Sequence, residues 1–74
     1  MNNRVLTDNL EITFSRSIAL DENKECESVV VVHVEGWEVE SHKSKSKSGK
    51  ELVEELMRDP GLVERCRKKL AEHT

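Results

Sequence analysis

Residues 29–39 read Val-Val-Val-Val-His-Val-Glu-Gly-Trp-Glu-Val, and this stretch decides the fold. Its β-branched run favours a strand, and apolar residues at both alternating positions indicate a strand that is covered on both faces or lies in a subunit contact. The alternation slips at Glu35-Gly36, which indicates either a two-residue hairpin turn or a β-bulge with glycine in a left-handed conformation. We favour the hairpin, which pairs Val34 with Trp37 and Val32 with Val39.

A second strand is predicted upstream, over residues 10–20, before a polar connection at residues 21–27. Arg16 interrupts its apolar face, and we expect this side chain to reach the sheet edge, to pair with a carboxylate, or to mark where the helices stop covering the sheet. The alternation is typical of a strand with one buried face, and its apolar positions are Leu10, Ile12, Phe14, Ile18 and Leu20.

Two helices are predicted after the sheet. Ser48 followed three residues later by Glu51 is a capping box, which starts the first helix. Asp59-Pro60-Gly61 then breaks the chain, and we expect Asp59 to cap a second helix that has Pro60 at its first position. The apolar positions of the two helices are Leu52, Val53, Leu56 and Met57, and then Leu62, Val63, Cys66 and Leu70.

This order, strands first and helices afterwards, predicts an α+β fold: a small antiparallel β-meander of two to three strands followed by two short α-helices packed on one face. Residues 1–74 are expected to form a single domain. We predict the sheet over residues 10–41, a charged connector over 42–47, and helices over 48–58 and 60–72. A core of this size is marginal, so we also predict a homodimer that forms through the β-sheet.

The charges divide the chain into two halves. Residues 1–40 carry 3 basic and 9 acidic side chains, a net charge of −6, whereas residues 41–74 carry 9 basic and 6 acidic side chains, a net charge of +3. The overall charge of −3 therefore hides a dipolar molecule. Such asymmetry favours a charged macromolecular partner over a small substrate.

The acidic half predicts a surface for binding a protein. An acidic sheet face can dock on a basic groove and block it, and Coulomb attraction speeds the encounter. Small inhibitors encoded by phages and mobile elements, anti-CRISPR proteins among them, often act by such occlusion. We therefore predict a small non-catalytic interaction protein, an inhibitor or adaptor whose partner has a basic surface. The predicted partner-binding residues are Glu11, Glu35, Trp37, Glu38 and Glu40.

The alternative is a nucleic-acid-binding module. In the segment 42–50, lysine alternates with serine, and a row of ammonium groups can follow a phosphate backbone. If the last strand continued past Val39, these lysines would share the face of Trp37, so we expect the segment to leave the sheet as a loop. The predicted nucleic-acid-binding residues are Lys43, Lys45, Lys47 and Lys50, together with Arg65, Lys68 and Lys69 of the basic last helix.

No motif in the sequence indicates catalysis, a cofactor or a metal. Cys26, Cys66, His33, His42 and His73 lack the close spacing of a zinc site. No nucleophile–base pattern and no phosphate-binding glycine loop is present, so we expect neither an enzyme nor a cofactor. No apolar run has the length of a signal peptide or a membrane span, and we expect a cytoplasmic protein with reduced thiols.

Overall fold

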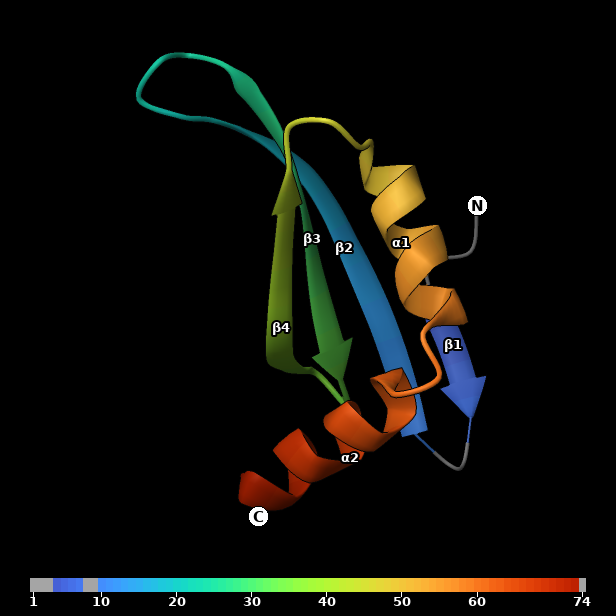
Figure 1. The fold of residues 1–74 in the computed structure, drawn as a ribbon. Helices are drawn as coiled ribbons and strands as arrows, with labels where there is room; N and C mark the ends of the chain where they lie inside the picture. The colour runs from blue at the N-terminus through green and yellow to red at the C-terminus, as the bar shows by residue number, and fades with distance from the viewer. Residues whose placement is uncertain (1–3, 8–9, 74) are drawn as a thin grey trace.

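The computed structural model describes residues 4–7 and 10–73, with backbone only in the first of these ranges. All four strands lie in one sheet in the order β1-β2-β3-β4, and each pairs antiparallel with its neighbour in sequence (Figure 1). The elements in chain order are β1 (Arg4–Thr7), β2 (Leu10–Leu20), β3 (Cys26–Val34), β4 (Trp37–Ser44), α1 (Gly49–Arg58) and α2 (Leu62–Glu72).

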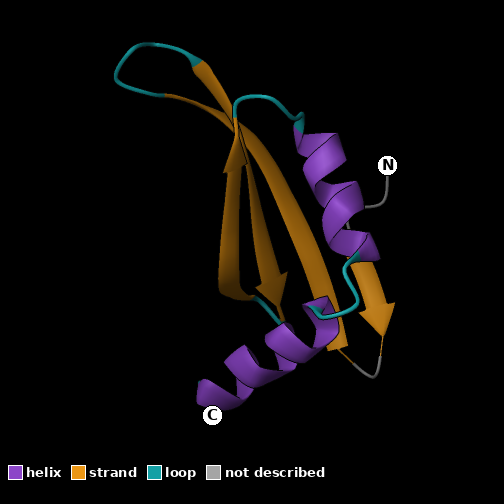
Figure 2. Ribbon diagram, in the orientation of Figure 1, coloured by secondary structure: helices purple, strands orange, loops and turns teal. Residues whose placement is uncertain are grey.

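An antiparallel meander followed by two helices on one face confirms the predicted α+β class (Figure 2). The meander has one strand more than the two to three that were predicted. The added strand is β1, which runs beside β2 with Val5 opposite Ile12 and Thr7 opposite Leu10. The run Arg4-Val5-Leu6-Thr7 does not alternate apolar with polar residues, so the predicted sheet begins only at residue 10.

The turn between β3 and β4 is the predicted two-residue hairpin at Glu35-Gly36. Both residues have positive φ, +50° for Glu35 and +86° for Gly36, as a type I′ turn requires. Val34 accordingly lies opposite Trp37, as predicted. Glycine adopts this conformation at no steric cost, whereas the Cβ atom of Glu35 makes it unfavourable.

The register changes two pairs beyond this turn. His33 lies opposite Glu38, but Val32 lies opposite Glu40, so Val39 is the extra residue of a β-bulge. The predicted pairing of Val32 with Val39 is therefore wrong. This bulge at Val39 is separate from the hairpin turn at Glu35-Gly36, and it reverses which of the following side chains of β4 face the helices.

The bulge lets β4 continue to Ser44, well into the segment 42–47 that was predicted to be a connector. Lys43 pairs with Val29, and it points to the face of the sheet that carries no helix. The expectation that Lys43 shares the face of Trp37 is wrong, because the bulge lies between these two residues. The predicted end of the sheet at residue 41 is wrong for the same reason.

Helix α1 starts where the capping box placed it. Ser48 is its N-cap, and the Ser48 Oγ accepts a hydrogen bond from the backbone N–H of Glu51 at 3.2 Å. Three of the four predicted apolar positions are buried, whereas the Met57 side chain is 48% exposed. The cap thus fixes the residue from which α1 begins to cover the sheet.

Helix α2 begins at Leu62, later than the predicted residue 60, and its N-cap is Gly61. The prediction that Asp59 caps this helix is wrong. The Asp59 Oδ1 accepts a hydrogen bond from the Gly61 N–H at 2.8 Å, which closes a turn ahead of the helix. Pro60 therefore lies in the turn between the helices and not in the first turn of α2.

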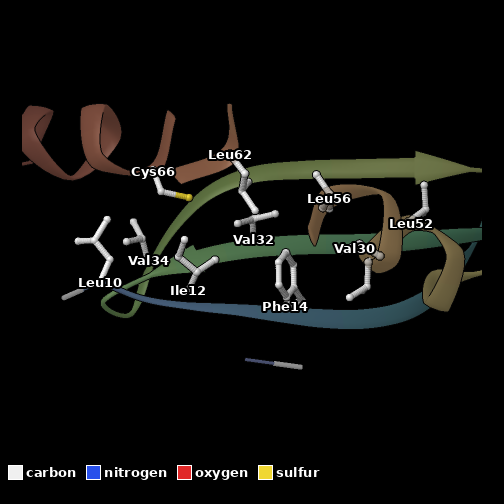
Figure 3. Close-up of a cluster of buried hydrophobic side chains, with 11 residues drawn as sticks. Leu10, Ile12, Phe14, Val30, Val32, Val34, Leu52, Leu56, Leu62 and Cys66 are labelled. Atoms are coloured by element: carbon white, nitrogen blue, oxygen red, sulfur yellow. The ribbon is translucent and has the colours of Figure 1, made fainter. Parts of the chain in front are cut away.

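The core lies between one face of the sheet and both helices (Figure 3). Even-numbered residues of β2 and β3 supply the sheet side, because alternate side chains of a strand point to the same face. Val39, Val63 and Leu70 pack against this core and are partly buried. The buried residues are Leu10, Ile12, Phe14, Val30, Val32, Val34, Leu52, Val53, Leu56, Leu62 and Cys66.

Candidate protein-interaction surfaces

The face of the sheet opposite the helices is a candidate interaction surface, called here the open face. Across β2, β3 and β4 its side chains form three rows in register. Val29 and Val31 lie at its centre, and each is only partly buried. The rows are Thr13–His33–Glu38, Ser15–Val31–Ser41 and Ser17–Val29–Lys43.

Carboxylates gather at the end of the open face near the β3–β4 turn. The Glu35 Oε1 accepts a hydrogen bond from the Glu11 N–H at 3.0 Å, and the Glu35 N–H donates to the Glu11 carbonyl at 3.0 Å. Glu38 lies beside them, exposed, and makes no ion pair with any described residue. The structure thus brings together three of the five residues predicted to bind a protein partner.

Trp37 is separated from these carboxylates. It lies opposite the buried Val34, on the helix side of the sheet, and its ring stacks on the His73 ring at the end of α2. The ring centroids are 4.6 Å apart with an interplanar angle of 10°. Trp37 is 49% exposed, so about half of its surface is covered. It does not lie on the open face with Glu38.

Glu40 also faces the helices, where it binds Arg65 of α2. The Arg65 Nε donates to the Glu40 Oε2 at 2.6 Å, and the Arg65 Nη2 donates to Oε1 at 3.3 Å. The hydrogen bond from Arg65 lowers the pKa of Glu40, and Glu40 in turn raises the pKa of Arg65. His42 and Asp59 complete the group, at 2.9 Å from Glu40 and from Arg65 respectively.

This Glu40–Arg65 pair joins two residues that the sequence assigned to different sites. A bidentate pair between β4 and α2 holds the helix against the sheet. Only 15% of the Glu40 side chain is exposed, which leaves little of it for a partner. The bulge at Val39 explains the placement, because without it Glu40 would point to the open face.

The predicted nucleic-acid-binding cations do not lie on one surface. Lys45 pairs with Asp21 and with Glu25 of the β2–β3 loop, and this contact raises the pKa of Lys45 and lowers that of Asp21. Lys47 pairs with Glu55 at 2.6 Å. Four of the seven predicted cations make no ion pair with a described residue, and these four are divided among β4, α1 and α2.

The four cations without such a pair are Lys43, Lys50, Lys68 and Lys69. Lys43 is on the open face, Lys50 is in the first turn of α1, and Lys68 and Lys69 are on α2. Lys68 and Lys69 flank a shallow groove that Glu40 and Glu72 also line. Nucleic-acid binding by these cations stays a prediction. A mobility-shift assay on the triple variant Lys43→Ala, Lys45→Ala, Lys47→Ala tests it.

Sequence reasoning missed a second surface, at the far end of β2. Ile18 and Leu20 continue the apolar alternation but are 73% and 66% exposed, because neither helix reaches them. Arg16 was the available signal, since one of its expected roles was to mark where the helices stop. In the structure Arg16 lies beside Gly49 at the start of α1.

The cysteines do not pair with each other. Cys66 is buried in the core, and burial raises the pKa of its thiol, whereas Cys26 is exposed at the start of β3. Within residues 10–73, no group of three or more His, Cys, Asp or Glu side chains is placed to hold a metal ion. Among the described elements, no helix has the length and hydropathy to cross a membrane.

Comparison of the chain with protein-family models, with curated proteins and with solved structures finds no significant match.

Proposed function

We propose that this chain is a small non-catalytic protein-interaction module, of the inhibitor or adaptor type, that binds a partner with a basic surface through its open face. The observation that supports the proposal is the composition of this face. Among the side chains that the structure describes, the open face and its β3–β4 turn carry four carboxylates, against the one ammonium group of Lys43. They are Glu11, Glu27, Glu35 and Glu38.

The open face suits a broad contact because most side chains in its three rows are short. Apart from Lys43 and Glu38, these rows carry valine, serine, threonine and one histidine. The Ser15 Oγ and the His33 Nε2 lie 3.3 Å apart and form a hydrogen bond between β2 and β3. Val29 and Val31 supply an apolar centre, and the charged rim steers the encounter and fixes the orientation.

An acidic face of this kind is suited to cover a basic groove on its partner, such as one that binds nucleic acid. The interaction would block the groove by occupying it, without any chemical step. Carboxylates that replace phosphates in such a groove meet the same lysines and arginines. The charge of the open face therefore supports the proposal of inhibition by occlusion.

The test is a pull-down from the native host with wild-type protein and with Glu38→Lys, followed by titration of the purified partner. Glu38 is chosen because it is exposed and its replacement breaks no contact between described residues. We expect Glu38→Lys to weaken binding at least about tenfold, with a steep loss of wild-type affinity in high salt.

The matched control is Glu64→Lys, which makes the same charge change on α2, on the other side of the molecule. We expect this variant to bind as wild type does. A partner that is retained by Glu38→Lys and lost by Glu64→Lys contradicts the assignment of the open face. The substitution of Glu40 is unsuited to this test, because it also removes the pair with Arg65.

A further inference from the structure

The β2–β3 hairpin continues beyond the covered part of the sheet as a projecting arm, residues 17–29 (Figure 1). Ile18 and Leu20 have the same parity as Ile12 and Phe14, so they lie on the helix side of the sheet. There they are exposed, with Cys26 opposite Leu20 and also exposed. The arm therefore carries an uncovered apolar strip where the covered part of the sheet has a helix.

A groove separates the base of the arm from the start of α1. It has a volume of about 570 Å³, and its lining includes Arg16, Ile18, Ser28 and Lys50. Gly49 packs on the Arg16 side chain, where an added Cβ would lie 3.3 Å from the Arg16 Cδ. Neither Arg16 nor Lys50 makes an ion pair with a described residue, and no carboxylate lines the groove. The base of the arm is cationic.

The tip of the arm has the opposite charge. Residues 21–27 contain four acidic side chains and Lys24, a net charge of −3. Lys45 binds two of these carboxylates and reduces the net charge of the tip to −2. From base to tip the arm thus presents two cations, an apolar strip and an acidic loop, in that order.

We propose that two copies of this chain associate through their arms, packed face to face and antiparallel about a two-fold axis. A two-fold axis across the middle of the strip places the acidic tip of each copy in the cationic groove of the other. Ile18 and Leu20 of one copy then cover those of its partner, as a helix covers the equivalent positions nearer the middle of β2. A surface with this order of charges is complementary to itself only in the antiparallel arrangement.

The arm contact lies on the helix side of the sheet and leaves the open face uncovered. The dimer would therefore present two open faces, and its formation does not depend on what those faces bind. This arrangement specifies the part of the sheet through which the predicted homodimer forms. It can be tested with the purified chain alone.

The first experiment is light scattering over a concentration series, with wild type and with the double variant Ile18→Thr, Leu20→Thr. Threonine keeps the β-propensity of the strand while removing most of the apolar strip. We expect wild type to reach twice the mass of the chain, and the double variant to raise the dimer dissociation constant about 100-fold or more. Met57→Gln, which removes a comparably exposed apolar side chain from α1, should leave association unchanged.

A wild-type protein that stays monomeric at high micromolar concentration overturns the proposal. Association that persists unchanged in the double variant, or that Met57→Gln weakens equally, overturns it as well. Circular dichroism confirms that each variant is folded.

The second experiment uses only wild-type protein and does not depend on how the variants fold. Cys26 is exposed on the arm, whereas Cys66 is buried, so a short bis-maleimide should join two copies through Cys26. We expect the cross-linked dimer in native conditions, with peptide mapping showing Cys26 joined to Cys26. A dimer by light scattering that gives no such cross-link shows that the arms are not in contact and overturns the proposal.

A charge exchange tests the antiparallel arrangement. Lys50→Glu places an acidic residue at the base of the arm, and Glu22→Lys places a basic one at its tip. We expect each variant alone to associate more weakly than wild type, and an equal mixture of the two to recover part of the association. A mixture that associates no better than either variant overturns the pairing of tip with base.

Discussion

The two halves of β2 share the same spacing of apolar residues, but the apolar face is covered in one half and exposed in the other. In the first half, Ile12 and Phe14 are 0% and 4% exposed, whereas in the second half Ile18 and Leu20 are 73% and 66% exposed. All four side chains point to the same face of the same strand. The difference lies in what covers them, because the helices pack only on the first half.

This comparison shows that alternation identifies the face of a strand but not whether that face is covered. The boundary is set by the start of α1, which Ser48 fixes as N-cap. Gly49 meets Arg16 at that boundary, so the helix begins where the apolar face of β2 is interrupted. We expect the stability of the covered half to depend on core packing. The order of the arm should depend on the contacts of its loop and on a second copy of the chain.

The largest expected effect is the loss of packing in the covered half. Phe14→Ala removes a buried aromatic ring and should lower the free energy of unfolding by about 3–4 kcal/mol, or unfold the protein. The measurement is urea denaturation at low micromolar concentration, followed by the fluorescence of Trp37. Leu20→Ala in the arm is the matched control and should change stability by less than about 0.5 kcal/mol. Equal losses in the two variants would show that the halves do not differ as described.

The next effect concerns the ion pair that holds α2 on the covered half. Glu40→Gln removes the carboxylate that accepts from Arg65 and should cost about 1–2 kcal/mol at neutral pH. The pKa of Glu40 is lowered below its ordinary value of 4.5. Ionised Glu40 therefore stabilises the fold above that value, and this stabilisation is lost as the pH falls through the lowered pKa.

The unfolding free energies of wild type and Glu40→Gln should accordingly converge in acid. Denaturation across a pH series measures this, with Glu64→Gln on the exposed side of α2 as a control that should follow wild type. A constant difference between wild type and Glu40→Gln at all pH values would show that the charge of Glu40 is not what holds the helix.

A smaller effect is expected in the loop at the tip of the arm. Lys24 has a φ of +62°, which is unfavourable for a residue with a Cβ atom. Lys24→Gly should therefore stabilise the protein by about 0.5–1 kcal/mol, measured by thermal or urea unfolding. Lys68→Gly, the same change within α2, should instead destabilise by about 1 kcal/mol. A loss of stability in Lys24→Gly would indicate that the side chain contributes more than the backbone geometry.

The smallest effect is expected where exposed charges connect the arm to the end of β4. Lys45→Ala removes the contacts with Asp21 and Glu25 without touching the core. We expect faster amide hydrogen exchange at residues 21–25 and no change in the global unfolding transition. High salt should produce the same faster exchange in wild type. Exchange that also accelerates in the covered half would mean that the two halves unfold together.

Local signals predicted much of this fold. Ser48 and Glu51 located the start of α1, and Glu35-Gly36 located the hairpin, because caps and turns depend on a few neighbouring residues. The candidate site was predicted less well. The bulge at Val39 places Glu40 on the helix side of the sheet. No residue near Val39 indicates a bulge in the sequence. Glu38 stayed on the open face because it precedes that bulge.

The sequence by itself determined the α+β class, the order of the strands and helices, and the division into an acidic and a basic half, since these follow from periodicity and composition. The tertiary structure alone decided which glutamates face outward, that Arg65 binds Glu40, and that Ile18 and Leu20 are left uncovered. These features depend on register and on helix position, which arise from contacts between residues far apart in the chain. A pattern of neighbouring residues specifies the faces of a strand, and only packing specifies what lies against them.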